Sequence, residues 1–220
     1  MVLRRLAPLL AATALVLSGC AAEVPAPATT TSSSPAAQPS ATPTPTPTPA
    51  GAIALGIEGL TFTHGGASVT FSFDDPEPLL AFVEQLTGQP GASEHFEDPW
   101  GNGDTWGTLY TWDDIKVYVL KDGPANVTVL ATTVGGIPVR TASGITVGST
   151  RDAVLATGGW DDGDADGDGL ADYLGMEGQE VEGVESLSRP GEPGREFIVV
   201  KLDGDVVTEL QSPSNDFSDI

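Results

Sequence analysis

Cysteine is almost absent from this sequence. The chain of 220 residues has one, Cys20, so no disulfide can form within it and the fold must be held by a hydrophobic core. Basic residues are scarce too, because 9 lysines and arginines stand against 31 aspartates and glutamates, a formal net charge of −22. This charge repels nucleic acid and anionic lipid headgroups, so we expect no nucleic acid partner. It favours solubility and the binding of cations instead.

The sequence also lacks the short motifs of common catalytic sites. No Gly-x-Ser-x-Gly, His-Glu-x-x-His or glycine-rich phosphate loop occurs, and the two histidines, His64 and His95, stand in turn-like contexts. A hydrolase that uses two carboxylates is an alternative in so acidic a chain, although no pair stands out. We therefore predict a protein that is not an enzyme.

The N-terminus has the layout of a secretion signal. Two arginines precede an apolar run over residues 6–17, which is shorter than a membrane-spanning helix. The run ends in Leu17–Cys20, Leu-Ser-Gly-Cys, which resembles the lipobox of bacterial lipoproteins. The resemblance implies that residues 1–19 are a cleaved signal peptide, and that palmitate-like acyl chains on Cys20 anchor the protein to the extracytoplasmic face of the cell membrane. An ordinary secretory signal with a cysteine at its cleavage site is the alternative.

Residues 20–52 form a stretch of low complexity. They are almost wholly alanine, proline, threonine and serine, and they include a Thr-Pro repeat over residues 42–49. Such a composition has little to bury, and its prolines favour the extended polyproline II conformation. We expect a lipidated, disordered tether of roughly 3 Å per residue between the membrane and the folded part.

The folded part is expected to start at residue 53 and to combine strands with two short helices. Alternation and turn residues predict strands at 60–63, 68–73, 106–112, 115–120, 126–134, 137–140, 181–187, 196–202 and 206–210. Caps and apolar spacing predict a helix from Pro76 to Gly88 with an apolar face of Leu79, Leu80, Phe82, Val83 and Leu86, and a second helix over 151–156. Asp203-Gly204 is the strongest hairpin signal.

The same order of predicted elements occurs twice in the chain. A strand, a capped helix, a gap and a hairpin occur in residues 53–143 and again in residues 144–220. The pattern predicts an α+β fold of two tandem helix-plus-antiparallel-sheet repeats. Residues 144–155 resemble the helix start in β-lactamase inhibitory protein and in small surface lipoproteins of similar architecture. No inhibitory contact residue is matched, so inhibition of a secreted or periplasmic enzyme stays an alternative function, and an unrelated α+β sheet stays an alternative fold.

Aspartate is concentrated in the acidic loop, residues 161–172. Alternating carboxylates on a backbone bent by glycine supply the oxygen ligands that calcium prefers, and the loop resembles those of thrombospondin type 3 repeats and EF-hands. The resemblance implies ligands from Asp162, Asp164, Asp166, Asp168, the carbonyl of Leu170, and Asp172. The twelfth position is Gly175, so the bidentate glutamate of an EF-hand is missing, and Asp172 or Glu177 would have to replace it. A solvated loop without an ion is the alternative.

Aromatic residues form a second cluster, which consists of Trp100, Trp106, Tyr110 and Trp112. The last three would share one face of a strand. If that face is exposed, it offers a flat platform for a sugar ring or for the apolar surface of a partner. The alternative is that this face packs in the hydrophobic core. Aromatic residues on a strand usually do so, which favours the alternative.

Taken together, these patterns predict a lipid-anchored, outward-facing surface protein that acts as a binding module and not as an enzyme. Calcium is its expected stabilising ion, and its partner is an unknown protein or cell-envelope component. An enzyme inhibitor and an unrecognised hydrolase are the alternatives.

Overall fold

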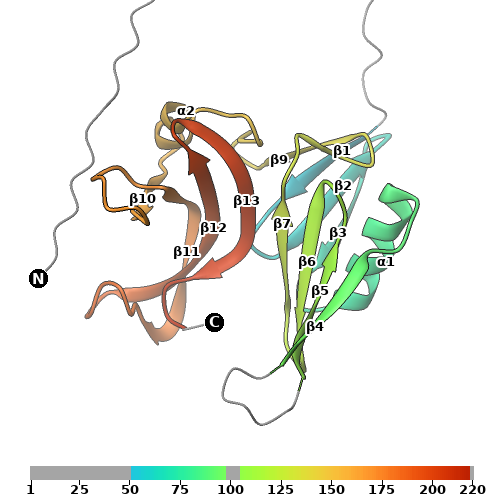
Figure 1. Cartoon of the computed structure of the whole chain (residues 1–220), viewed down its shortest axis with the longest axis horizontal. Coiled ribbons are helices and arrows are strands. Elements are labelled where there is room, and N and C mark those ends of the chain that lie inside the picture. Colours follow the sequence, from blue (N-terminus) through green and yellow to red (C-terminus); the bar gives the residue numbers. More distant parts are fainter. Residues whose placement is uncertain (1–50, 98–104, 219–220) are drawn as a thin grey trace, which may run out of the picture. The chain divides into compact units, whose positions relative to one another are not determined.

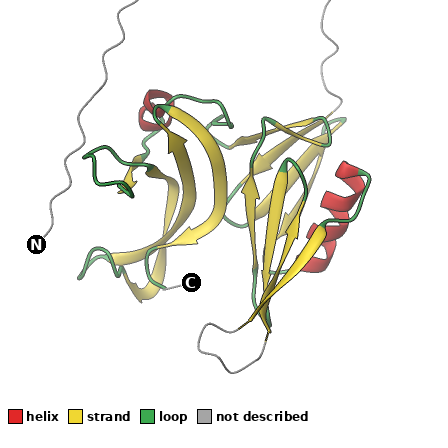
Figure 2. Cartoon of the chain, viewed as in Figure 1, coloured by secondary structure: helices red, strands yellow, loops and turns green. Residues whose placement is uncertain are grey.

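The computed structural model describes residues 51–97 and 105–218, and Figure 2 shows that strands dominate this part of the chain. The predictions for the signal peptide, for Cys20, for the tether up to residue 50 and for Trp100 lie outside the described residues. Within the described part, no helix is both long enough and apolar enough to cross a membrane.

The strands form two sheets (Figure 1). The first has five strands, in the order β3 (Ala67–Ser72), β2 (Gly59–His64), β1 (Gly51–Leu55), β9 (Ile137–Thr141) and β8 (Thr133–Val134). The second has eight strands, in the order β10 (Trp160–Gly163), β11 (Tyr173–Glu185), β12 (Pro193–Asp203), β13 (Val206–Asn215), β7 (Ala125–Val129), β6 (Ile115–Leu120), β5 (Thr105–Thr111) and β4 (Ala92–Glu97). All pairs are antiparallel except β1 with β9.

The eight-stranded sheet is built from two meanders of four strands. Strands β4–β7 follow helix α1 (Pro76–Thr87), and β10–β13 follow helix α2 (Arg151–Ala156). The last strands of the two meanders, β7 and β13, pair and so join them. The five-stranded sheet comes entirely from residues 51–141 and has no counterpart among residues 144–218. The fold is therefore mostly β with two sheets, and α+β describes it only loosely.

Both sheets contribute to one hydrophobic core. The five-stranded sheet supplies Ile53, Leu55 and Leu60. The eight-stranded sheet supplies the core row, five side chains that are each at most 1% exposed: Ile115, Val129, Leu210, Val200 and Leu174. Members of the core row lie opposite one another on neighbouring strands, so they point to the same side of the sheet.

Helix α1 has the predicted register. Pro76 lies in its first turn, and Gly88 ends it in the left-handed conformation with φ 73°, which glycine adopts without steric cost. The buried members of its predicted apolar face are Leu79, Phe82 and Val83. The ring of Phe82 stacks on Phe71 of β3, with 4.0 Å between the ring centroids. This stacking holds α1 against the five-stranded sheet.

Several predicted boundaries are wrong. Residues 51 and 52, assigned to the tether, are the start of β1 and pair with β2. The predicted strand at 126–134 is divided between β7 and β8, while β4 was not predicted, because its residues Ala92–Glu97 have no apolar alternation. Strand β11 begins at Tyr173, eight residues before the predicted start. The last hairpin turns at Gly204-Asp205, because Asp203 still pairs with Val206.

Removal of a core side chain from α1 should reveal how much this helix contributes to stability. Leu79 is fully buried, so Leu79→Ala should lower the free energy of unfolding by about 2 to 5 kcal/mol. Gln85→Ala, on the exposed side of the same helix, should change it by less than about 0.5 kcal/mol. Urea unfolding of both variants is the measurement, and equal losses would contradict the observed helix register.

Candidate functional site

The acidic loop connects β10 to β11 and is fastened to the domain at its C-terminal end. The guanidinium of Arg151, at the start of α2, donates a hydrogen bond of 2.7 Å to the carbonyl oxygen of Ala171. The N–H of Leu202 donates to the carbonyl oxygen of Asp172 at 2.8 Å. Ala171 itself is 8% exposed and belongs to the core cluster. The loop therefore projects from a fixed base.

Three of the predicted ligands come together at the surface. Carboxylate oxygens of Asp164, Asp166 and Asp172 all lie within 4.8 Å of one another, and we call these residues the aspartate triad. The backbone bends between them at Gly167 and Gly169, whose φ angles of 77° and 92° favour glycine. The predicted spacing thus produces one cluster of three carboxylates.

Backbone N–H groups hold the triad in place. The carboxylate of Asp164 accepts hydrogen bonds from Gly167 at 2.7 Å and from Gly169 at 2.9 Å. These two N–H groups, that of Gly169 first, lower the pKa of Asp164, because they favour its charged form. One oxygen of Asp172 accepts from the N–H groups of Ala165 and Asp166 at 2.7 and 3.3 Å. The loop thus keeps three negative charges close together, which suits a hard cation that prefers oxygen ligands.

The other predicted ligands lie elsewhere. The carboxylate of Asp168 accepts from the N–H of Leu170 and is outside the triad, and the side chain of Leu170 is 60% exposed. Asp162 belongs to β10, where loss of water and the charge of Asp216 raise its pKa. Glu177 does not fold back to the loop, because its carboxylate accepts from the N–H and the hydroxyl of Ser143 at 2.8 and 2.6 Å.

The predicted aromatic cluster lies mainly on the core side of the eight-stranded sheet. Trp112 is 4% exposed, and its indole N–H donates to the carbonyl oxygen of Gln89 at 2.9 Å. Tyr110 stacks on Trp112 at 6.5 Å between centroids and packs against the core, and Trp106 is half-buried. Trp112 is therefore a core residue that no partner can reach.

The opposite side of this sheet, which we call the open face, was not singled out by sequence reasoning. One residue along from the core row on each strand lies a second row of paired, half-buried side chains, which we call the open row: Lys116, Thr128, Gln211 and Val199. Leu109 and Tyr118 lie opposite each other beside this row, and Phe96 meets the edge of Tyr118 at 5.7 Å between centroids. The alternation of side chains in residues 105–120 predicts strands with two faces. It does not show which of the two faces is covered by the rest of the fold.

The row ends at an aromatic residue. Gly175 of β11 lies opposite Val199 and Trp160, and a Cβ atom at Gly175 would lie 2.3 Å from the indole of Trp160. Only glycine therefore leaves room for this ring. Trp160 also lies beside Phe197, with 5.4 Å between the centroids. The open face thus carries aromatic side chains on both meanders.

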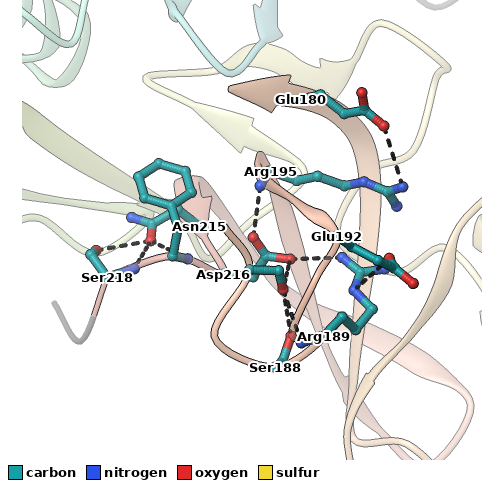
Figure 3. Close-up of polar contacts among 10 residues, drawn as sticks. Glu180, Ser188, Arg189, Glu192, Arg195, Asn215, Asp216 and Ser218 are labelled. Atoms are coloured by element: carbon teal, nitrogen blue, oxygen red, sulfur yellow. Dashed lines mark hydrogen bonds and ion pairs between the residues drawn. The ribbon is translucent and has the colours of Figure 1, made fainter. Parts of the chain in front are cut away.

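A polar cluster near the C-terminus completes the set of candidate sites (Figure 3). The carboxylate of Asp216 accepts hydrogen bonds from Arg189 at 2.7 Å, from the hydroxyl of Ser186 at 2.8 Å and from the N–H of Arg195 at 2.7 Å. The Asp216 side chain is 6% exposed. Burial opposes its charge, but these donors outweigh that effect and lower its pKa. Both carboxylate oxygens therefore accept hydrogen bonds, and the cluster fastens the segment after β13 to β12 and to the β11–β12 connection.

Comparison with protein family models, curated proteins and solved structures gives no match for this chain.

The Asp216 cluster gives a prediction about pH. Asp216→Asn should lower the free energy of unfolding at pH 7 by about 1 to 3 kcal/mol, because it weakens a buried charge-assisted contact. The pKa of Asp216 is lowered on folding, so its contribution is present above the usual aspartate pKa near 4 and is lost as the pH falls through the lower folded value. The difference between the two proteins should therefore shrink below about pH 4.

Chemical denaturation at a series of pH values measures this difference. Asp205→Asn is the matched control, because Asp205 also pairs with an arginine, at 3.1 Å, but is 82% exposed. Its effect should stay below about 1 kcal/mol at every pH. An Asp216→Asn difference that does not change with pH would contradict the role of the charge.

Proposed function

We propose that the protein is a binding module and not an enzyme, held at the outer face of the cell membrane by acyl chains on Cys20 and presented on a tether of residues 20–50. The signal layout supports the anchor, and the open face supports the binding role. The partner is a protein or cell-envelope component that lies on this face.

The open face has the character of a contact surface. A sheet that only faces water is expected to carry polar and charged side chains on that side. Here Leu109, Tyr118, Val199 and Phe96 lie among threonine, glutamine and lysine, and Phe96 is 40% exposed. A mixture of aromatic and polar side chains is typical of surfaces that bind other proteins.

Lys116 indicates the chemistry of the partner. The ion pairs among the described residues involve the cations Arg151, Arg189, Arg195 and Lys201. Lys116 is half-buried within the open row and has no carboxylate partner within that part of the chain, although acidic residues far outnumber basic ones. A partner carboxylate over Lys116 would form a charge-assisted contact that is shielded from water by the flanking side chains.

Calcium is the second part of the proposal. The aspartate triad offers one oxygen from each of three carboxylates, and the remaining ligands of a calcium ion would be water or carbonyl oxygens. Bound calcium would cancel the repulsion within the triad and so stabilise the loop. Its role would be structural, since the loop and the open face are distinct sets of residues.

A second candidate is the inhibitor of a secreted or periplasmic enzyme, and the order of the elements favours it. A helix followed by a four-stranded meander occurs twice, and the two meanders share one sheet. This repeated order supports a fold of two tandem repeats similar to β-lactamase inhibitory protein. In this case the partner on the open face would be the enzyme.

The binding proposal can be tested by photo-crosslinking in intact cells. A photoreactive amino acid in place of Tyr118, on the open face, should give one main adduct, whereas the same group in place of Val206 should not. The additional change Lys116→Glu should reduce the adduct at least about tenfold, because two carboxylates then repel each other. Equal adducts from both positions, or an adduct unaffected by Lys116→Glu, would refute the open face as the binding surface.

The calcium proposal can be tested by thermal unfolding. A dissociation constant of about 0.1 mM would stabilise the domain by roughly 1.4 kcal/mol at about 1 mM calcium, a rise in Tm of about 3 to 6 °C, and magnesium should act less. Asp166→Asn should abolish the rise. Asp168→Asn removes the same charge from outside the triad and should largely preserve it. Equal effects of the two ions on the unmodified protein would exclude a specific calcium site.

A further inference from the structure

The two sheets have four edge strands, and three of them are protected against pairing with another chain. Strand β4 carries Glu94 and Glu97 and has an irregular register at its end. Strand β10 is four residues long, contains two aspartates and has a bulge, and β8 is two residues long. Charges, bulges and short length are the features that keep edge strands from associating.

Strand β3 has none of these protections. Its six residues, Ala-Ser-Val-Thr-Phe-Ser, include no charge and no proline, and all six pair with β2 without a register shift. Residues 67–70 are exposed, and Val69 is 55% exposed. Among the described residues, no backbone hydrogen bond joins residues 67–71 to anything other than β2. Within residues 51–97 and 105–218, the outer side of β3 therefore presents backbone donors and acceptors that have no hydrogen-bond partner.

The side chains of β3 fit a second, antiparallel copy of the same strand. Val69 and Phe71 lie on one face, and Ser68, Thr70 and Ser72 lie on the other. In such a pair, a two-fold axis relates the two copies of β3. If this axis passes through Val69 or Thr70, apolar side chains of one copy lie opposite apolar side chains of the other, and hydroxyls lie opposite hydroxyls. On the hydroxyl face, this would continue a pattern already present between β2 and β3, where Thr61 bonds to Thr70 at 2.9 Å.

Charge also favours a second copy at this position. The β2–β3 hairpin, Gly59–Ser72, contains no acidic residue, no lysine and no arginine. Two copies that each carry a net charge near −22 repel each other over most of their surface, but an approach along this hairpin keeps their carboxylates apart. Charges more than about 8 to 10 Å apart are largely screened at physiological salt.

We propose that β3 is a self-association edge, through which two copies of the protein join their five-stranded sheets by antiparallel β3–β3 pairing. A contact limited to one strand is small, so the dimer is weak and transient. Because the copies are both strongly acidic, the dimer becomes tighter as salt increases. This dependence is opposite to that of a contact with a basic partner, which salt would weaken.

The test is sedimentation equilibrium of residues 21–220, which retain every described residue and contain no cysteine. Between about 10 μM and 1 mM, a range suited to weak dimers, the protein should show a monomer–dimer equilibrium that tightens from about 0.05 to 0.5 M salt. Val69→Lys and, independently, Ala67→Lys should weaken the dimer at least about tenfold. Val206→Lys is the matched control, since Val206 is a 47% exposed valine on β13, and it should have no effect.

A positional measurement identifies the strand. A single cysteine in place of Val69 or of Thr70 should give a disulfide-linked dimer at one of the two positions, and a cysteine in place of Val206 should give none. A monomer at every concentration, or equal weakening by Val206→Lys, overturns the proposal. So does a monomer that dimerises only after deletion of residues 42–49, since the tether and not a second copy would then cover the edge.

Discussion

The pairing of β13 with β7 is the contact on which the rest of the structure depends. It joins two meanders that lie far apart in the sequence, and three consecutive residues of β13 each have a separate task. Leu210 continues the core row, Gln211 continues the open row, and the hydroxyl of Ser212 donates to the carbonyl oxygen of Gly56 at 2.9 Å. Core, open face and five-stranded sheet are thus connected through one short segment.

Local signals predicted the parts of the fold that need only local information. Pro76 and Gly88 determine the ends of α1, and Thr150 caps α2 by accepting from the N–H of Ala153 at 3.2 Å. Local signals could not predict which segments pair when those segments are distant in the sequence. Gly51 belongs to a strand only because His64 lies opposite it. In the sequence it stands between two alanines, a residue type that is common in the preceding tether. The β7–β13 junction has no local signature at all.

The candidate site was predictable to a similar extent. The spacing of aspartates and glycines predicted that Asp164 and Asp172 would meet, because the glycines bend the chain within a few residues. It could not predict that Asp162 would lie in a paired strand and face the charges of Arg189 and Asp216. The open face was missed for a related reason. Strand alternation gives two faces, and only the tertiary fold decides which of them is covered.

The distribution of charge links the two proposed contact surfaces. Net charge keeps the protein soluble, but it also opposes any contact with another acidic molecule. The β2–β3 hairpin avoids this opposition by having no ionised carboxylate, which suits a copy of the same acidic chain. The open face instead places Lys116, which forms no ion pair with any described residue, among half-buried side chains, and this suits a different, carboxylate-bearing partner. Since β3 and the open row belong to different sheets and share no residue, each surface can have its own specificity.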